Sequence, residues 1–95
     1  MLFVVHAYDY TDGQAFQRRM AARPTHFEGA RDLKAAGHFV MGGALLGTDN
    51  KMIGSMMVLD FEDDAQMSQW RDNEPYITGK VWEKIDIKPF RMADI

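Results

Sequence analysis

Four stretches of the chain are rich in β-branched, aromatic and other apolar residues and are bounded by turn residues, a pattern typical of β-strands. They span residues 2–10, 39–46, 52–61 and 81–91, and the loop at 47–51 predicts a hairpin between the second and the third. Pro89 places the last stretch at an edge of a sheet, because proline cannot donate to a strand ladder.

The segment between the first two strands predicts two helices separated by Pro24. A turn at residues 11–13 supplies Thr11 or Asp12 as a cap for a short helix at about residues 13–22. Proline fits a first helical turn better than a helix interior, so a second helix is expected at about residues 24–36. Gly37 is well placed to end it.

The segment before the last strand predicts one further helix. Asp63, with Gln66 three positions later, resembles a capping box that opens a helix to about Asp72, and Pro75 lies beyond its end. The order is then β-α-β-β-α-β, the ferredoxin-like α+β plan, with helices on one face of a four-stranded antiparallel sheet.

Apolar residues occupy both faces of the predicted sheet. In the first strand, Leu2 and Val4 alternate with Phe3, Val5 and Ala7, and in the third, Met56 and Val58 alternate with Met57, Leu59 and Phe61. Helices cover one face, and a second copy packing sheet against sheet would cover the other. We therefore expect a homodimer of the α+β barrel kind, although Lys84, Asp86 and Lys88 make one face of the last strand polar.

Composition narrows the class of protein. A chain of 95 residues suits one domain, here residues 1–95, and 46% hydrophobic with 26% charged residues is typical of a globular protein. The net charge of -3 and the lack of a basic patch argue against nucleic acid as a partner. No cysteine is present, which excludes thiol chemistry and fits the cytoplasm, and the first ten residues are too short for a signal peptide or a membrane span.

His26 and Glu74 are the main candidates for chemistry. His26 shares a helix face with Ala30 and Leu33 and should be buried near the start of its helix. The topology brings that start close to the end of the last helix, where Glu74 lies, and a carboxylate beside an imidazole prepares the ring as a general base or acid. The alternative is a core histidine with a structural role and an ordinary acidic turn residue.

Other polar residues give weaker signals. Arg23, expected just before the helix, could bind an anionic substrate or be solvated, and Tyr76 could donate a hydrogen bond or simply pack. His6 and His38 lack metal-ligand spacing, so we expect no metal site. No glycine-rich phosphate loop occurs, which leaves nucleotide cofactors without support.

Four stretches together resemble the YCII-related (YciI-like) family: RPTHF at 23–27, GHFVMGG at 37–43, IGSMMVLDFED at 53–63 and NEPYITGKVWEKIDIKPF at 73–90. The resemblance implies a dimeric ferredoxin-like fold and an active site built on a histidine–aspartate dyad in a cleft beside the dimer interface. The family histidine falls on His26. The acid of the family's Asp-Pro-Tyr motif falls on Glu74, one methylene longer than the family residue, and the serine of its Gly-Ser pair falls on Ser55, where a hydroxyl could orient a ligand.

The leading hypothesis is thus a small enzyme without a cofactor. His26 and Glu74 would transfer protons in a lyase-, isomerase- or dehydrohalogenase-like reaction on a small, often aromatic molecule, with Arg23, Ser55 and Tyr76 lining the pocket. A second hypothesis keeps the fold as a non-catalytic ligand-binding or accessory domain. A third, a cofactor-independent monooxygenase, rests on shared architecture alone.

Overall fold

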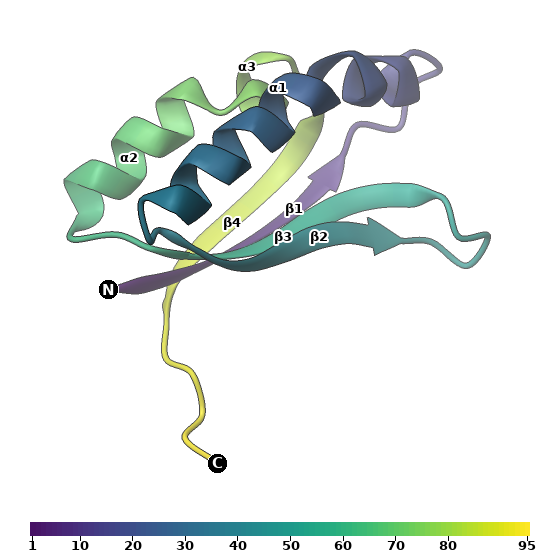
Figure 1. Cartoon of the computed structure of the whole chain (residues 1–95). Coiled ribbons are helices and arrows are strands. Elements are labelled where there is room, and N and C mark those ends of the chain that lie inside the picture. Colours follow the sequence, from purple (N-terminus) through teal and green to yellow (C-terminus); the bar gives the residue numbers. More distant parts are fainter.

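The computed structural model describes residues 1–95, and it contains one antiparallel sheet with a layer of helices on one side (Figure 1). The elements are β1 (Leu2–Asp9), α1 (Ala15–Ala35), β2 (Phe39–Leu46), β3 (Met52–Asp60), α2 (Asp64–Asn73), α3 (Pro75–Thr78) and β4 (Trp82–Phe90). The strand order is β2-β3-β1-β4, so the predicted ferredoxin-like fold is confirmed, and Pro89 lies in an edge strand as expected.

α1 is one continuous helix of 21 residues with Pro24 inside it, so the prediction of two helices was wrong. An interior proline removes one backbone hydrogen bond and costs about 3 kcal/mol. Buried side chains on both sides of it, Arg19 and His26, hold the two halves of the helix against the sheet. His26 consequently lies in the middle of a long helix and not in a first turn.

Asp12 and Gly37, the residues predicted to cap the helical segment, lie at the two ends of α1. The Asp12 carboxylate accepts from the Gln14 backbone N–H at 2.9 Å, just before the helix begins. Gly37 adopts a φ of 82°, and the His38 backbone N–H donates to the Leu33 carbonyl at 2.8 Å. This arrangement closes the helix as a Schellman motif, for which glycine is the preferred residue.

The helix α3 was not predicted. Pro75 occupies its first turn, and the Glu74 carboxylate caps it by accepting from the Tyr76 backbone N–H at 3.2 Å. α2 ends at Asn73, and Glu74, the residue before Pro75, is extended as expected. The chain then forms the extra turn of α3 before β4. This extra turn brings Tyr76 under α1, to which α3 packs.

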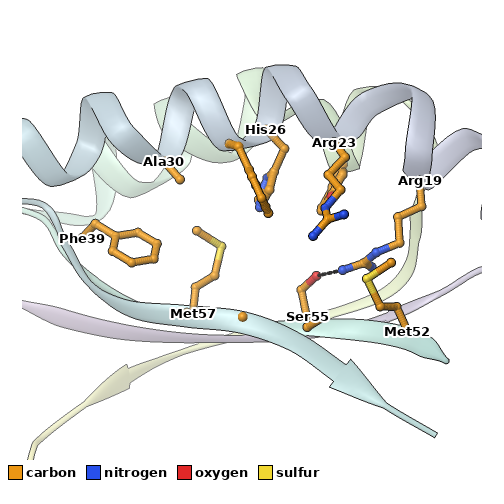
Figure 2. A pocket seen from close by; sticks show the side chains of 13 residues that line it. Arg19, Arg23, His26, Ala30, Phe39, Met52, Ser55 and Met57 are labelled. Atoms are coloured by element: carbon orange, nitrogen blue, oxygen red, sulfur yellow. Dashed lines mark hydrogen bonds between the residues drawn. The ribbon is translucent and has the colours of Figure 1, made fainter. Parts of the chain in front are cut away.

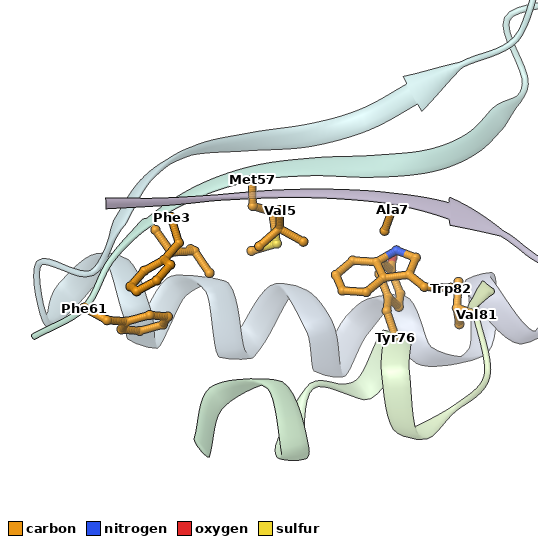
Figure 3. Close-up of a cluster of buried hydrophobic side chains, with 9 residues drawn as sticks. Phe3, Val5, Ala7, Met57, Phe61, Tyr76, Val81 and Trp82 are labelled. Atoms are coloured by element: carbon orange, nitrogen blue, oxygen red, sulfur yellow. The ribbon is translucent and has the colours of Figure 1, made fainter. Parts of the chain in front are cut away.

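The core lies between the sheet and the helices. Side chains from β1, β3 and the segment after α2 meet there, and Figure 3 shows Phe3, Val5, Ala7, Met57, Phe61, Tyr76, Val81 and Trp82 in this layer. No helix covers the other face of the sheet, where Met41 is 52% exposed (Figure 1). No helix is long and apolar enough to cross a membrane.

Candidate active site

A cavity of about 280 Å³ lies between α1 and the β2–β3 half of the sheet (Figure 2). Most of its apolar lining lies toward the C-terminal half of α1, and its arginines lie toward the N-terminal half. The polar lining residues are Arg19, Arg23, His26, Ser55 and Tyr76, and the large apolar ones are Phe27, Phe39, Met52 and Met57.

Three of the polar side chains come from α1. Arg19, Arg23 and His26 are spaced by four and three residues, which places them on one face of a helix on successive turns. Arg23 lies within the helix, so the expectation that it precedes the helix was wrong. Figure 2 shows it pointing from α1 toward the sheet, between the other two.

His26 and Glu74 are in direct contact, although 48 residues separate them in sequence. Nδ1 of His26 forms a hydrogen bond with Oε1 of Glu74, and the two side chains are only 9% and 5% exposed. An ionised carboxylate can only accept, so this contact places a hydrogen on Nδ1, and in the neutral ring the lone pair is then on Nε2. Nε2 has no partner in the chain and is not fully enclosed, so it is available to a bound molecule.

The phenol ring of Tyr76 packs against one face of the His26 imidazole ring. The two rings stack with centroids 3.8 Å apart and planes at 11°. The Tyr76 hydroxyl has no hydrogen-bond partner in the chain, and burial raises the pKa of this phenol. The group therefore stays protonated at neutral pH and can donate to a ligand.

A buried polar network lies beside this pair, and the sequence did not reveal it. Arg19, only 3% exposed, donates from Nη1 to both Asp9 carboxylate oxygens at 2.9 Å and from Nη2 to Ser55 Oγ at 3.0 Å. Trp82 Nε1 donates to the same Ser55 oxygen at 3.1 Å. Burial raises the pKa of the Asp9 carboxyl, and the Arg19 charge opposes this shift. The spacing of residues 19, 23 and 26 would have placed Arg19 on the same helix face as His26, had one continuous helix been predicted.

Arg23 is a cation without a counterion. Its guanidinium carbon lies 4.8 Å from the centroid of the Phe27 ring, and the side chain forms no salt bridge or hydrogen bond. The other two histidines lie outside the cavity: His6 packs edge-on against Tyr8, and Nδ1 of His38 contacts the Asp60 carbonyl oxygen at 2.7 Å. No three His, Asp or Glu side chains are grouped so that they could hold a metal ion.

Comparison with known proteins agrees with the resemblance found in the sequence. The model of the YCII-related domain matches residues 1–91, and the chain belongs to this family. It is 28% identical to Protein YciI of Escherichia coli O6:H1 and of Shigella flexneri, over 96% of this chain and 97% of those proteins. It is 24% identical to an uncharacterized protein of Haemophilus influenzae, with the same coverage.

A solved structure shares the fold. The 5-chloro-2-hydroxyhydroquinone dehydrochlorinase TftG of Burkholderia phenoliruptrix AC1100, in complex with 2,5-dihydroxybenzoquinone, superposes with a TM-score of 0.85. The alignment covers 98% of this chain and 96% of that one, at 22% sequence identity.

Proposed function

We propose that this protein is a small enzyme that moves a proton on a small molecule, with His26 as general base or acid and Glu74 as the group that orients it. The contact between the two side chains, with Nε2 free at the cavity, carries this proposal. The chain's own side chains suffice for such a step, so we propose that it needs no cofactor.

In an elimination, the Nε2 lone pair would accept a proton from the substrate. The electrons of the broken bond would form a new double bond, and the leaving group would depart with its own bonding pair. Glu74 would stabilise the imidazolium that forms, because a hydrogen bond to an ionised partner is about twice as strong as a neutral one. In an isomerisation the imidazolium would return the proton to another atom of the substrate.

The neighbouring structure supports a small aromatic substrate. That protein is a dehydrochlorinase, and its complex holds 2,5-dihydroxybenzoquinone. We propose that a ring of similar size enters the cavity here, and that Arg23, Ser55 and Tyr76 bind it.

Turnover by histidine variants tests this proposal. We would screen chlorinated hydroquinones for chloride release and then compare His26→Gln with the unmodified protein. General acid–base catalysis contributes about 10²- to 10⁴-fold, and the variant should lose that much in kcat. His38→Gln, outside the cavity, is the matched control and should retain activity. Full activity in His26→Gln would refute the role of this residue.

We further propose that residues 1–95 act as one domain and pair with a second copy through the open sheet face. Leu2, Val4 and Met56 are half-buried there, and no element of the chain covers them. Light scattering should give the mass of two 10.9 kDa chains, and Met56→Glu should shift the population toward monomer. A monomeric parent protein would refute the pairing.

A non-catalytic binding domain is the second candidate, because Glu74 also has a structural task. Its carboxylate caps α3. On this alternative, the unmodified protein would show no turnover, and bound ligands would be recovered chemically unaltered. His26→Gln would then lower only the free energy of unfolding.

A further inference from the structure

The hydroxyl group of Ser55 has one hydrogen-bonding capacity that the chain leaves unused. Its oxygen accepts from Arg19 Nη2 at 3.0 Å and from Trp82 Nε1 at 3.1 Å. Guanidinium and indole groups can only donate, so the direction of both bonds is fixed. A serine oxygen has two lone pairs, and both are occupied. Only the O–H hydrogen remains, and it forms no bond to a protein acceptor.

Ser55 is buried and lines the cavity (Figure 2). A molecule bound in the cavity could therefore supply the acceptor for the Ser55 O–H. The neighbouring polar groups are donors as well. Arg23 points into the cavity with its guanidinium unpaired, and the Tyr76 hydroxyl has no partner. Arg19 Nε, which is fully buried, has no acceptor either. No carboxylate lines the cavity, and the side-chain acceptors left are His26 Nε2 and the Tyr76 hydroxyl oxygen, which can also donate.

The positive charge at the cavity is local. Asp9 balances Arg19. With a neutral His26, the charges of Glu74 and Arg23 also sum to zero. Glu74 does not line the cavity, however, whereas Arg23 lines it and forms no salt bridge. A wall of donors that includes this unpaired guanidinium favours a ligand that carries a negatively charged oxygen.

The size and the apolar part of the cavity favour a single ring. A cavity of about 150 Å³ holds benzene, and this one measures about 280 Å³, enough for a ring with substituents. Phe27, Phe39 and Met57 supply the apolar surface that such a ring would contact.

We propose that the cavity binds its substrate as an aromatic oxyanion, whose charged oxygen accepts from the Ser55 hydroxyl and the Arg23 guanidinium. Arg19 and Trp82 are positioning residues, since they occupy the serine lone pairs and thereby make its hydroxyl a donor to the ligand. This inference names the substrate class for the site proposed above and rests on that proposal for the location of the chemistry. The charged oxygen belongs to a phenolate or a carboxylate.

Two pairs of small ligands distinguish the effect of the anionic charge on affinity from the effect of ring shape. 4-Nitrophenol is compared with 4-nitroanisole, and benzoate with benzamide. Each pair shares one ring and differs in the anionic oxygen. Binding is measured by calorimetry on the His26→Gln variant, in which the imidazole cannot contribute. The phenolate absorbance band also reports the ionisation of bound nitrophenol, at a pH where the free ligand is partly ionised.

We expect at least one anion to bind roughly tenfold more tightly than its neutral partner, and bound nitrophenol to be enriched in phenolate. The pair with the larger ratio identifies the type of oxygen. Ser55→Ala and Arg23→Gln should each weaken anion binding by roughly 10- to 100-fold, the range for a hydrogen bond to a charged group. Neutral probes should bind nearly unchanged, and Arg91→Gln, an equal charge change outside the cavity, should have no effect.

Trp82→Phe tests the positioning role, because Trp82 does not line the cavity. It should lower the anion-to-neutral ratio by roughly 2- to 10-fold, whereas a merely structural role would change stability and leave the ratio intact. This variant also keeps the test open if Ser55→Ala fails to fold.

Equal affinities within both pairs, or no measurable anion binding at the solubility limit, would overturn the proposal. Loss of catalysis in His26→Gln would still stand in that case, since turnover and anion preference are measured in separate assays, and only turnover depends on the imidazole. Conversely, anion preference without any turnover would leave this inference intact and refute the enzymatic role.

Discussion

The contact between His26 and Glu74 can be measured without a substrate, by a double-mutant cycle on stability. His26→Phe keeps a ring of similar shape against Tyr76 and removes both nitrogens. Glu74→Ala removes the carboxylate. The difference between the double variant and the sum of the single variants isolates the pairwise term.

The structure sets the expected magnitude. Both side chains are buried, and one partner is a carboxylate, so the hydrogen bond should contribute about 1.5–3 kcal/mol to coupling. Glu74→Ala also removes the cap of α3, which adds about 1 kcal/mol to that single variant and cancels in the cycle. A destabilisation of 1 kcal/mol lowers Tm by about 4–8 °C in a domain of this size.

Urea unfolding followed by circular dichroism gives the four free energies. The protein concentration is held constant, because dissociation of the proposed dimer would otherwise shift apparent stability. Glu74→Gln, which can still accept at both sites, should lie between the parent and Glu74→Ala. A coupling energy below about 0.5 kcal/mol, the usual limit for independent sites, would show that the two groups do not act as a pair.

Three further predictions concern the surroundings of the site. Asp9→Asn should destabilise the protein by about 3–5 kcal/mol in urea unfolding, because it leaves the buried Arg19 cation unpaired; an unchanged midpoint would contradict this. Gly54→Ala should lower the free energy of unfolding by about 3 kcal/mol in the same assay, because its Cβ would lie 2.2 Å from a carbonyl oxygen of β1. In the control Gly43→Ala, the added Cβ has no atom within 4 Å, so the free energy of unfolding should change little. Hydrogen bonds from the Arg18 guanidinium, and then from the Gln14 backbone N–H, lower the pKa of the Asp12 carboxyl to about 2. Its stabilising contribution should therefore be complete above the ordinary value of 3.8 and disappear as pH falls toward 2, and an NMR titration midpoint near 3.8 would exclude the Arg18–Asp12 ion pair.

The strands and their order could be predicted because each strand contributes a periodic apolar face. Phe3 and Val5, predicted to share one face of the first strand, do lie together in the core, where Met57 of β3 joins them. Ser55 was assigned to the site only through a family resemblance, and its partners were missed. A hydrogen bond between Arg19 and Ser55, 36 residues apart, depends on the packing of α1 over β3, which local sequence patterns do not specify.

Pro24 shows how a local rule can hide the arrangement of a candidate site. Proline destabilises a helix interior locally, and the sequence was divided there. In the folded protein the helix continues through it. As a result Arg19, Arg23 and His26 lie on one helix face, with fixed positions relative to each other. Two separate helices would set His26 apart from the arginines, and the cavity would then have no common wall of positive and basic groups. The continuity of α1 therefore connects the oxyanion site proposed around Ser55 with the proton-transfer site proposed at His26.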